Sequence, residues 1–300
     1  MWAILWVLLC LNPGLRATQP GGSSFDGTDN AAFAGNLGFI SLQADATNGV
    51  AVGANFVEGF AYSGNVGWIF FGDGSPSNGI HYSNTNGSDT GVNVVNYTSN
   101  PSGGEADLRG FAFGANIGWI QFEATGDPRL ELKTGTLRGF AYGANVGWIN
   151  LGEMGLTLTT RFIKPEPDSD GDGMGDGYEI QNFGSLRVSN GTGDFDGDGR
   201  SDGSEYIADT DPTDPVSRLE VIAFAPASPA DGSFDLTFTS QPTRFYQIVG
   251  RTELNDPSGI DIGAVICAEG LTTLQNLPER KEKNFFYTVV AKLPLAPPSH

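Results

Sequence analysis

The sequence contains little of what most often stabilises or equips a small exported protein. Its 300 residues include only Cys10 and Cys267, and Cys10 lies in an N-terminal apolar stretch, so no intrachain disulfide can form once that stretch is removed. Histidine is confined to His81 and His300, which excludes an HExxH zinc helix and offers no recognisable Cys–His nucleophile. Stability must therefore come from core packing and from bound metal.

Basic residues are also scarce. The chain has 16 Lys and Arg against 35 Asp and Glu, which gives a net charge of −19 and a sequence pI of about 4.2. Such a chain repels nucleic acid and anionic membranes, so we expect neither as a partner. Residues 166–214 hold 14 of the acidic residues against Arg187 and Arg200, a composition typical of a disordered acidic tract or of a place where cations are held.

Long apolar runs are absent beyond the N-terminus. The run from Trp2 to Leu11 is too short to span a bilayer, and Asn12-Pro13-Gly14 and the small Ala17 follow it, as in a signal peptide. We therefore assign residues 1–17 as a signal peptide and expect no membrane span. The predicted location is secreted or at the cell surface.

Glycine, by contrast, is abundant, with 43 residues, twice the usual share of ~7%, which favours tight turns between short strands. The motif Asn-x-Gly-aromatic-Ile occurs four times, at spacings of 29, 51 and 29 residues, starting at Asn36, Asn65, Asn116 and Asn145. The long spacing is one period plus a 22-residue insertion within 71–101. Such self-similarity predicts a repeat architecture in which each unit buries its face on its neighbour.

Each copy predicts a β-hairpin. Short aromatic and β-branched runs flank residues with turn chemistry, as at 143–146 between the runs 140–142 and 148–151. A third short strand is expected after some hairpins, at 129–135 and 155–160. The predicted fold is mostly β, with a four-copy β-hairpin repeat domain over residues 25–162.

Period-2 alternation assigns the two faces of the second strand in the last three copies. The face expected in the core carries Ile69, Phe71, Ile120, Phe122, Ile149 and Leu151. The opposite face carries a tryptophan and, two residues later, Phe70, Gln121 or Asn150. One interpretation is a ladder in which each tryptophan packs on the next repeat. The other is a row of half-exposed rings that stacks on sugars, with candidate ligand-binding residues Trp68, Trp119, Trp148, Gln121 and Asn150.

Two acidic loops, at 168–179 and 194–205, match the pattern D-x-[DN]-x-[DN]-G-x5-E in full. A tight loop that turns alternate side chains inward supplies the oxygen ligands that Ca²⁺ prefers. The sequence therefore predicts two Ca²⁺ sites, with Met174 and Arg200 acting through their backbone carbonyls. The predicted ligands are Asp168, Asp170, Asp172, Met174, Asp176 and Glu179 in the first loop, and Asp194, Asp196, Asp198, Arg200, Asp202 and Glu205 in the second. The alternative is a solvated acidic linker.

A short helix is expected after each loop, at 178–183 and 206–209, and none before it. This loop-then-helix form resembles dockerin repeats and the thrombospondin type 3-like repeats of bacterial surface proteins. The resemblance implies a two-site calcium module at 165–215. A dockerin would also imply a cohesin-type partner, although these loops lie in mid-chain with a further domain behind them.

Behind a Pro- and Asp-rich boundary at 209–217, alternating runs such as 234–238 predict a small C-terminal β-sandwich at 218–300. The four repeat copies, the two loops, the TDPTDP segment at 210–215 and the C-terminal strands together resemble a family of bacterial exported proteins. Its members join GxAxxxNxGWI repeats to DxDGDGxxDxxE calcium segments and a terminal β domain. The resemblance implies a surface or secreted location, bound calcium and a C-terminal region used in export or attachment, and it implies no particular activity.

These features lead to one main hypothesis and two alternatives. The main hypothesis is a non-enzymatic, calcium-stabilised surface or matrix protein with a structural or adhesive role, whose partner is a polysaccharide or another surface protein. The first alternative is a carbohydrate-binding protein that uses the repeat tryptophans. The second is an enzyme of unknown type with a catalytic pair in the insertion near His81 and Asp89. The GRSDG match to G-x-S-x-G at 199–203 lies inside the second calcium loop and is not a candidate nucleophile.

Overall fold

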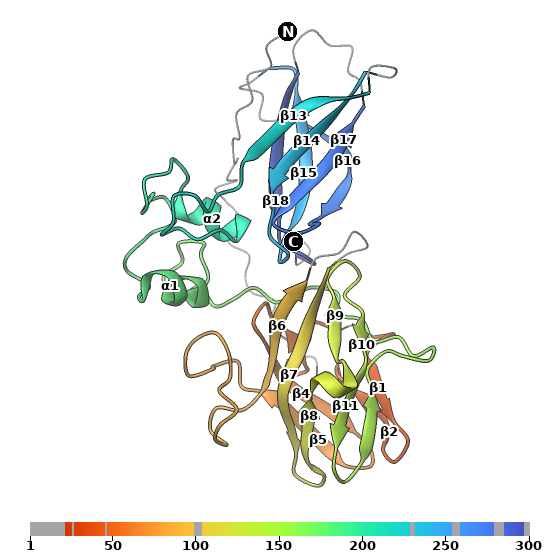
Figure 1. Ribbon diagram of the computed structural model, residues 1–300. Helices are drawn as coiled ribbons and strands as arrows, with labels where there is room; N and C mark the ends of the chain where they lie inside the picture. Colours follow the sequence, from red (N-terminus) through yellow and green to blue (C-terminus); the bar gives the residue numbers. More distant parts are fainter. Residues whose placement is uncertain are drawn as a thin grey trace.

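The structure, a computed structural model, describes residues 22–25, 27–45, 47–98, 104–228, 232–253, 259–278 and 285–296. The signal peptide assigned to residues 1–17 lies outside these ranges. The described chain is mostly β, as the sequence predicts, and contains two α-helices. Figure 1 shows a β-barrel in the lower half, two small sheets above it, and the helices α1 (Asp176–Phe183) and α2 (Asp202–Ala208) to one side.

Eight antiparallel strands close the barrel. In order around it they are β1 (Ala31–Ala34), β2 (Gly38–Ser41), β4 (Phe56–Ser63), β5 (Gly67–Gly72), β7 (Glu105–Gly114), β8 (Gly118–Phe122), β11 (Phe140–Gly143) and β12 (Gly147–Asn150). Each strand pairs with the next, and β12 pairs with β1. Closure leaves these eight strands without a free edge, which removes the usual route to edge-to-edge aggregation.

Four further strands belong to the same sheet: β3 (Ala51–Val52), β6 (Val92–Thr98) and β9 (Arg129–Glu131) pair with barrel strands, and β10 (Leu137–Arg138) pairs with β9. The third strand expected at 129–135 is thus present over three residues, with β10 as its partner. The one expected at 155–160 was wrong, since this segment forms only isolated bridges. Its backbone groups bond three different segments, for example Leu158 to Leu137 and Thr159 to Asp29, so no ladder builds up with any one.

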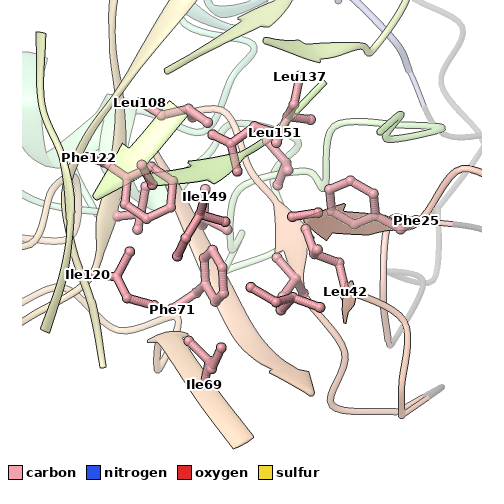
Figure 2. A pocket seen from close by; sticks show the side chains of 17 residues that line it. Phe25, Leu42, Ile69, Phe71, Leu108, Ile120, Phe122, Leu137, Ile149 and Leu151 are labelled. Carbon is pink, nitrogen blue, oxygen red and sulfur yellow. The ribbon is translucent and has the colours of Figure 1, made fainter. Parts of the chain in front are cut away.

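Inside the barrel, a small side chain lies opposite a large one in each of four hairpins. These hairpins are β1–β2, β4–β5, β7–β8 and β11–β12. The pairs are Ala32 with Ile40, Ala61 with Ile69, Ala112 with Ile120, and Ala141 with Ile149. All eight are at most 3% exposed. Figure 2 shows the apolar side chains converging, and a cavity of only about 30 Å³ remains between them. The interior is a packed core rather than a ligand lumen, and the core face predicted from alternation is confirmed.

Hydrogen bonds between turns join the four strand pairs at one end of the barrel. The asparagine of each motif copy donates through Nδ2 to a backbone carbonyl in the preceding turn. The bonds are Asn65 to Leu37 at 2.9 Å, Asn116 to Val66 at 2.9 Å, Asn145 to Ile117 at 3.0 Å and Asn36 to Val146 at 3.2 Å. They run once around the barrel and return to the start, and we call them the asparagine ring. The motif glycines follow at positive φ, +82° at Gly67 and +77° at Gly118, a conformation that favours glycine.

The C-terminal part consists of two three-stranded antiparallel sheets, in the orders β13-β14-β17 and β16-β15-β18. Their strands are β13 (Val221–Ser228), β14 (Ser233–Thr239), β15 (Phe245–Arg251), β16 (Ile260–Cys267), β17 (Thr272–Leu277) and β18 (Phe286–Lys292). Leu236 and Phe238 of the first sheet and Ile248 and Val289 of the second are fully buried in one common cluster. The two sheets therefore share a core, as expected for a sandwich.

The C-terminal sheets also cover the barrel end away from the asparagine ring. Phe245, 9% exposed, belongs to the barrel core, and Cys267 and Leu295 pack against it. The backbone N–H of Ile163 donates to the Leu295 carbonyl at 2.9 Å. Burial raises the pKa of the Cys267 thiol, which makes it a packing residue rather than a reactive one.

Candidate metal centre and aromatic belt

Each acidic loop brings three carboxylates to one point. In both loops, one oxygen from every aspartate of a triplet lies within 4.8 Å of the others. The triplets are Asp168–Asp170–Asp172 and Asp194–Asp196–Asp198. Three like charges at this separation repel one another unless a cation lies between them.

The first aspartate of each loop orders the backbone around its triplet. Asp168 accepts hydrogen bonds from the backbone N–H groups of Gly171 at 2.7 Å and Gly173 at 3.1 Å. Asp194 accepts bonds from the two glycines at the same loop positions, at 2.8 and 2.9 Å. Gly173 has a φ of +97°, so the sharp turn there favours glycine. The two loops thus adopt the same conformation for the same chemical reasons.

The last residue of each loop is a buried glutamate in the first turn of a helix. Glu179 in α1 is 0% exposed and Glu205 in α2 is 1% exposed. Within the described chain, neither carboxylate oxygen of Glu179 has a hydrogen-bond partner. Glu205 Oε1 accepts a bond from Thr210 Oγ1 at 3.1 Å, and its Oε2 has no partner there. A buried carboxylate without donors is costly unless a cation supplies the missing interaction.

Burial, together with the charge of the neighbouring aspartates, raises the pKa of Glu179 to about 7 and that of Glu205 to about 8. Burial likewise raises the pKa of Asp172, whose Oδ2 has no hydrogen-bond partner among the described residues. The same holds for Asp196 in the second loop. Each loop therefore combines a carboxylate triplet with a buried glutamate that has at least one oxygen without a donor among the described residues.

The ninth-position aspartates close the loops rather than face the triplets. Asp176 accepts bonds from the Ser169 backbone N–H at 2.7 Å and from its hydroxyl at 2.6 Å. Asp202 accepts bonds from the Phe195 N–H at 2.9 Å and from the Ser189 hydroxyl. Both oxygens of each carboxylate are thus used, which suits a contact to the ion through water. Met174 and Arg200 donate their own N–H groups to the fifth-position aspartates at 2.9 and 2.7 Å.

Sequence reasoning missed residues that join the two loops and link them to the C-terminal part. Thr210 holds Glu205, and its carbonyl accepts a bond from the Tyr178 hydroxyl of the first helix at 3.0 Å. Arg218, in the segment that leads into β13, lies 3.8 Å from Asp198 of the second loop. The Thr-Asp-Pro motif at 210–212 marks this region in the sequence, but nothing in the sequence indicates which residues Thr210 and Arg218 contact.

Aromatic side chains encircle the outside of the barrel. Four pairs of rings lie directly opposite each other across adjacent strands, with centroids 4.8–5.2 Å apart. The pairs are Phe33 with Phe39, Tyr62 with Trp68, Phe113 with Trp119, and Tyr142 with Trp148. All eight side chains are 38–65% exposed, and we call them the aromatic belt.

The belt bears on the two interpretations of the tryptophans. Trp68, Trp119 and Trp148 are 46–49% exposed, and their ring contacts are with aromatic residues of their own strand pair. The bonds that connect neighbouring pairs at the turns come from the asparagine ring. The tryptophans therefore leave a large apolar surface open to solvent, which the ladder interpretation did not anticipate.

The two amide residues predicted beside the tryptophans differ. Asn150 accepts bonds from the backbone N–H groups of Gly152 and Glu153 at 2.9 and 2.7 Å and donates to the Glu153 carbonyl at 2.9 Å, so it closes a turn. The amide of Gln121 has no hydrogen-bond partner in the described part of the chain and remains open to a ligand. In the insertion, His81 bonds the Val94 carbonyl at 3.2 Å, whereas Asp89 accepts bonds from Ser77 and Ser83.

A scan against protein-family models, a search of curated proteins and a search of solved structures found no match to this chain. No α-helix in the described ranges is long and apolar enough to cross a membrane.

Proposed function

We propose that the chain is an exported, calcium-stabilised surface or matrix protein with a structural or adhesive role. The observation that carries this proposal is the pair of buried glutamates, Glu179 and Glu205, each beside an aspartate triplet and each with at least one carboxylate oxygen that has no donor in the described chain. A hard, oxygen-preferring cation would neutralise each cluster. Calcium is favoured over Mg²⁺ because the loops offer many protein oxygens, whereas Mg²⁺ usually keeps several waters.

A structural role is supported by the contacts of the calcium module with both β parts. Asn55 of the barrel donates to Glu166 at 2.5 Å, and Lys164, just before the module, pairs with Glu58 of β4 at 2.5 Å. On the other side, Arg244 of the C-terminal part donates to the Ile207 carbonyl of α2 at 2.8 Å. Ordering of the loops by calcium would therefore fix the connection between the barrel and the C-terminal sheets.

The barrel itself is best explained as four copies of one hairpin unit. This proposal is supported by the fourfold recurrence of the Ala–Ile core pair, the asparagine bond and the exposed aromatic pair. Each position that recurs in the four copies of the motif then has one physical task within the unit. The outer face is left available for binding.

The calcium proposal is tested by titrating the full chain with Ca²⁺ by calorimetry and by limited proteolysis with and without chelator. We expect two bound Ca²⁺ per chain, and cleavage within 166–214 only after chelation, with affinities of about 10⁻⁴–10⁻³ M. The variant Glu179→Gln with Glu205→Gln should lose binding. Asp261→Asn, which removes one exposed charge on β16 of the C-terminal part, is the control. No binding at millimolar Ca²⁺, or chelator-independent cleavage, would refute the proposal.

A second candidate function is carbohydrate binding by the aromatic belt. The specific observation that favours it is the exposure of the three tryptophans at 46–49%, each beside a second ring. Flat apolar faces in this arrangement suit the C–H faces of sugar rings. Protection of tryptophan fluorescence from acrylamide by soluble polysaccharide tests it, and quenching that polysaccharide leaves unchanged would contradict it.

A further inference from the structure

The four units of the barrel differ in the residues that flank their exposed aromatic pairs. Around the belt, the first ring of each aromatic pair lies opposite one residue of the neighbouring strand pair. Gln121 is the residue directly opposite Tyr142, and Ser41 is the residue directly opposite Tyr62. The corresponding residue for Phe113 is Phe70, and for Phe33 it is the turn-closing Asn150. The fourth unit is thus the one whose aromatic pair is flanked by an amide that the protein does not use.

A short turn adds a wall to this unit. The 3-10 helix η1 (Ala124–Gly126) follows β8 and packs against β11. A Cβ on Gly126 would lie 2.0 Å from the Phe140 carbonyl oxygen and 3.0 Å from Cζ3 of Trp148. Only glycine allows the turn to approach the indole this closely. The turn therefore fixes one side of a groove at the edge of the Trp148 ring.

The groove has a volume of about 190 Å³. Three aromatic side chains and three polar ones line it: Phe140, Tyr142 and Trp148, and Gln121, Glu123 and Thr125. Across the described chain, none of the three polar side chains has a hydrogen-bond partner. The site thus combines an aromatic wall, in which Phe140 and Tyr142 meet Trp148 edge to face, with an amide, a carboxylate and a hydroxyl that are free to bond a ligand.

We propose that this groove, which we call the Trp148 groove, binds one neutral sugar ring of a polysaccharide. The proposal rests on the carbohydrate-binding candidate function and names its site. The aromatic wall would cover the C–H face of the ring, and Gln121, Glu123 and Thr125 would bond its hydroxyls. The volume, below the ~300 Å³ of typical small-molecule sites, suits one ring rather than a longer segment. The net charge of −19 and Glu123 itself disfavour an anionic sugar.

Trp68 provides a matched control. It is 49% exposed and its ring lies 4.9 Å from Tyr62, whereas Trp148 is 48% exposed and lies 5.0 Å from Tyr142. Removing either indole breaks the same kind of aromatic pair, so the two variants share any loss of stability. Only the Trp148 variant damages the groove.

The test records indole N–H resonances of the full chain in calcium while glucose, galactose, mannose or xylose is added, and then soluble galactomannan and xylan. Polygalacturonate serves as the anionic comparison. We expect the Trp148 resonance to shift with at least one neutral sugar and the Trp68 resonance to stay. Trp148→Ala and Gln121→Ala should weaken polysaccharide binding by about tenfold, and Trp68→Ala by less than about twofold.

The outcomes separate this proposal from the broader one. Equal losses of polysaccharide affinity for Trp148→Ala and Trp68→Ala would overturn the proposal that the Trp148 groove is the site and would leave the whole belt as the binding surface. Shifts with polygalacturonate but with no neutral sugar would overturn the ligand class. If no probe moves any indole resonance while near-ultraviolet circular dichroism shows native packing, both the groove and carbohydrate binding are refuted, and the calcium proposal is unaffected.

Discussion

The asparagine ring can be tested one bond at a time. Replacing Asn116 with Ala removes a 2.9 Å bond to the Val66 carbonyl, which then has to be satisfied by water at the barrel end. A hydrogen bond of this kind contributes about 0.5–1.5 kcal/mol. For a domain of this size, 1 kcal/mol lowers the melting temperature by roughly 2–4 °C. Asn116→Asp should cost more than Asn116→Ala, because it removes the donor and places a carboxylate beside the same carbonyl.

The measurement is thermal and urea unfolding of the full chain in saturating calcium, followed by tryptophan fluorescence. Asn65→Ala and Asn145→Ala, which break bonds of 2.9 and 3.0 Å, should match Asn116→Ala within about 0.5 kcal/mol. Val188→Ala, an exposed residue outside the barrel, is the control. If the asparagine variants melt like this control, or if Asn116→Asp is as stable as the parent, the ring does not join the units.

Three further predictions concern the proposed calcium sites and the core. Glu205→Gln alone should weaken calcium binding by about tenfold or more, measured by calorimetry, since it removes the ionised ligand that closes the second loop. In chelator, the pKa values of Glu179 and Glu205 are raised above the 4.5 of an ordinary glutamate, so their contribution to stability should be fullest below pH 4.5 and fall as the pH rises through about 7 and 8. Saturating calcium should abolish that loss, and unfolding curves from pH 5 to pH 9 that show the same trend with and without calcium would contradict the assignment. Ile120→Ala, at a side chain 2% exposed, should cost about 2–5 kcal/mol in urea unfolding, and a cost below about 1 kcal/mol would mean that the barrel interior is loosely packed.

The sequence predicted the local chemistry of the fold well. Strict alternation placed Ile120 and Ile149 in the core and Trp119 and Trp148 on the outside, because a strand with one buried face cannot slip by one residue without exposing it. The loop positions of the aspartates could also be read from the motif. Both predictions depend on residues close together in the chain.

The sequence did not show which residues far apart in the chain contact each other. The pairing of β12 with β1 joins residues such as Asn150 and Phe33, and closure of this kind leaves no local signal. Likewise, the motif showed an asparagine at each turn but not that Asn36 bonds Val146 at the other end of the repeat region. The same holds for Phe245, a C-terminal residue that packs into the barrel core.

The division of tasks within one motif suggests where function can vary. Alanine, isoleucine, asparagine and glycine of each copy are used by the core, the ring and the turn, so a change in any of them would disturb closure. The residue two positions after the motif aromatic differs in all four units: it is Ser41, Phe70, Gln121 or Asn150, and of these Asn150 closes a turn. It also faces outward, beside the exposed rings. If the proposed carbohydrate binding holds, we therefore expect specificity to depend most on Gln121, whose amide has no partner among the described residues and which adjoins the turn of η1.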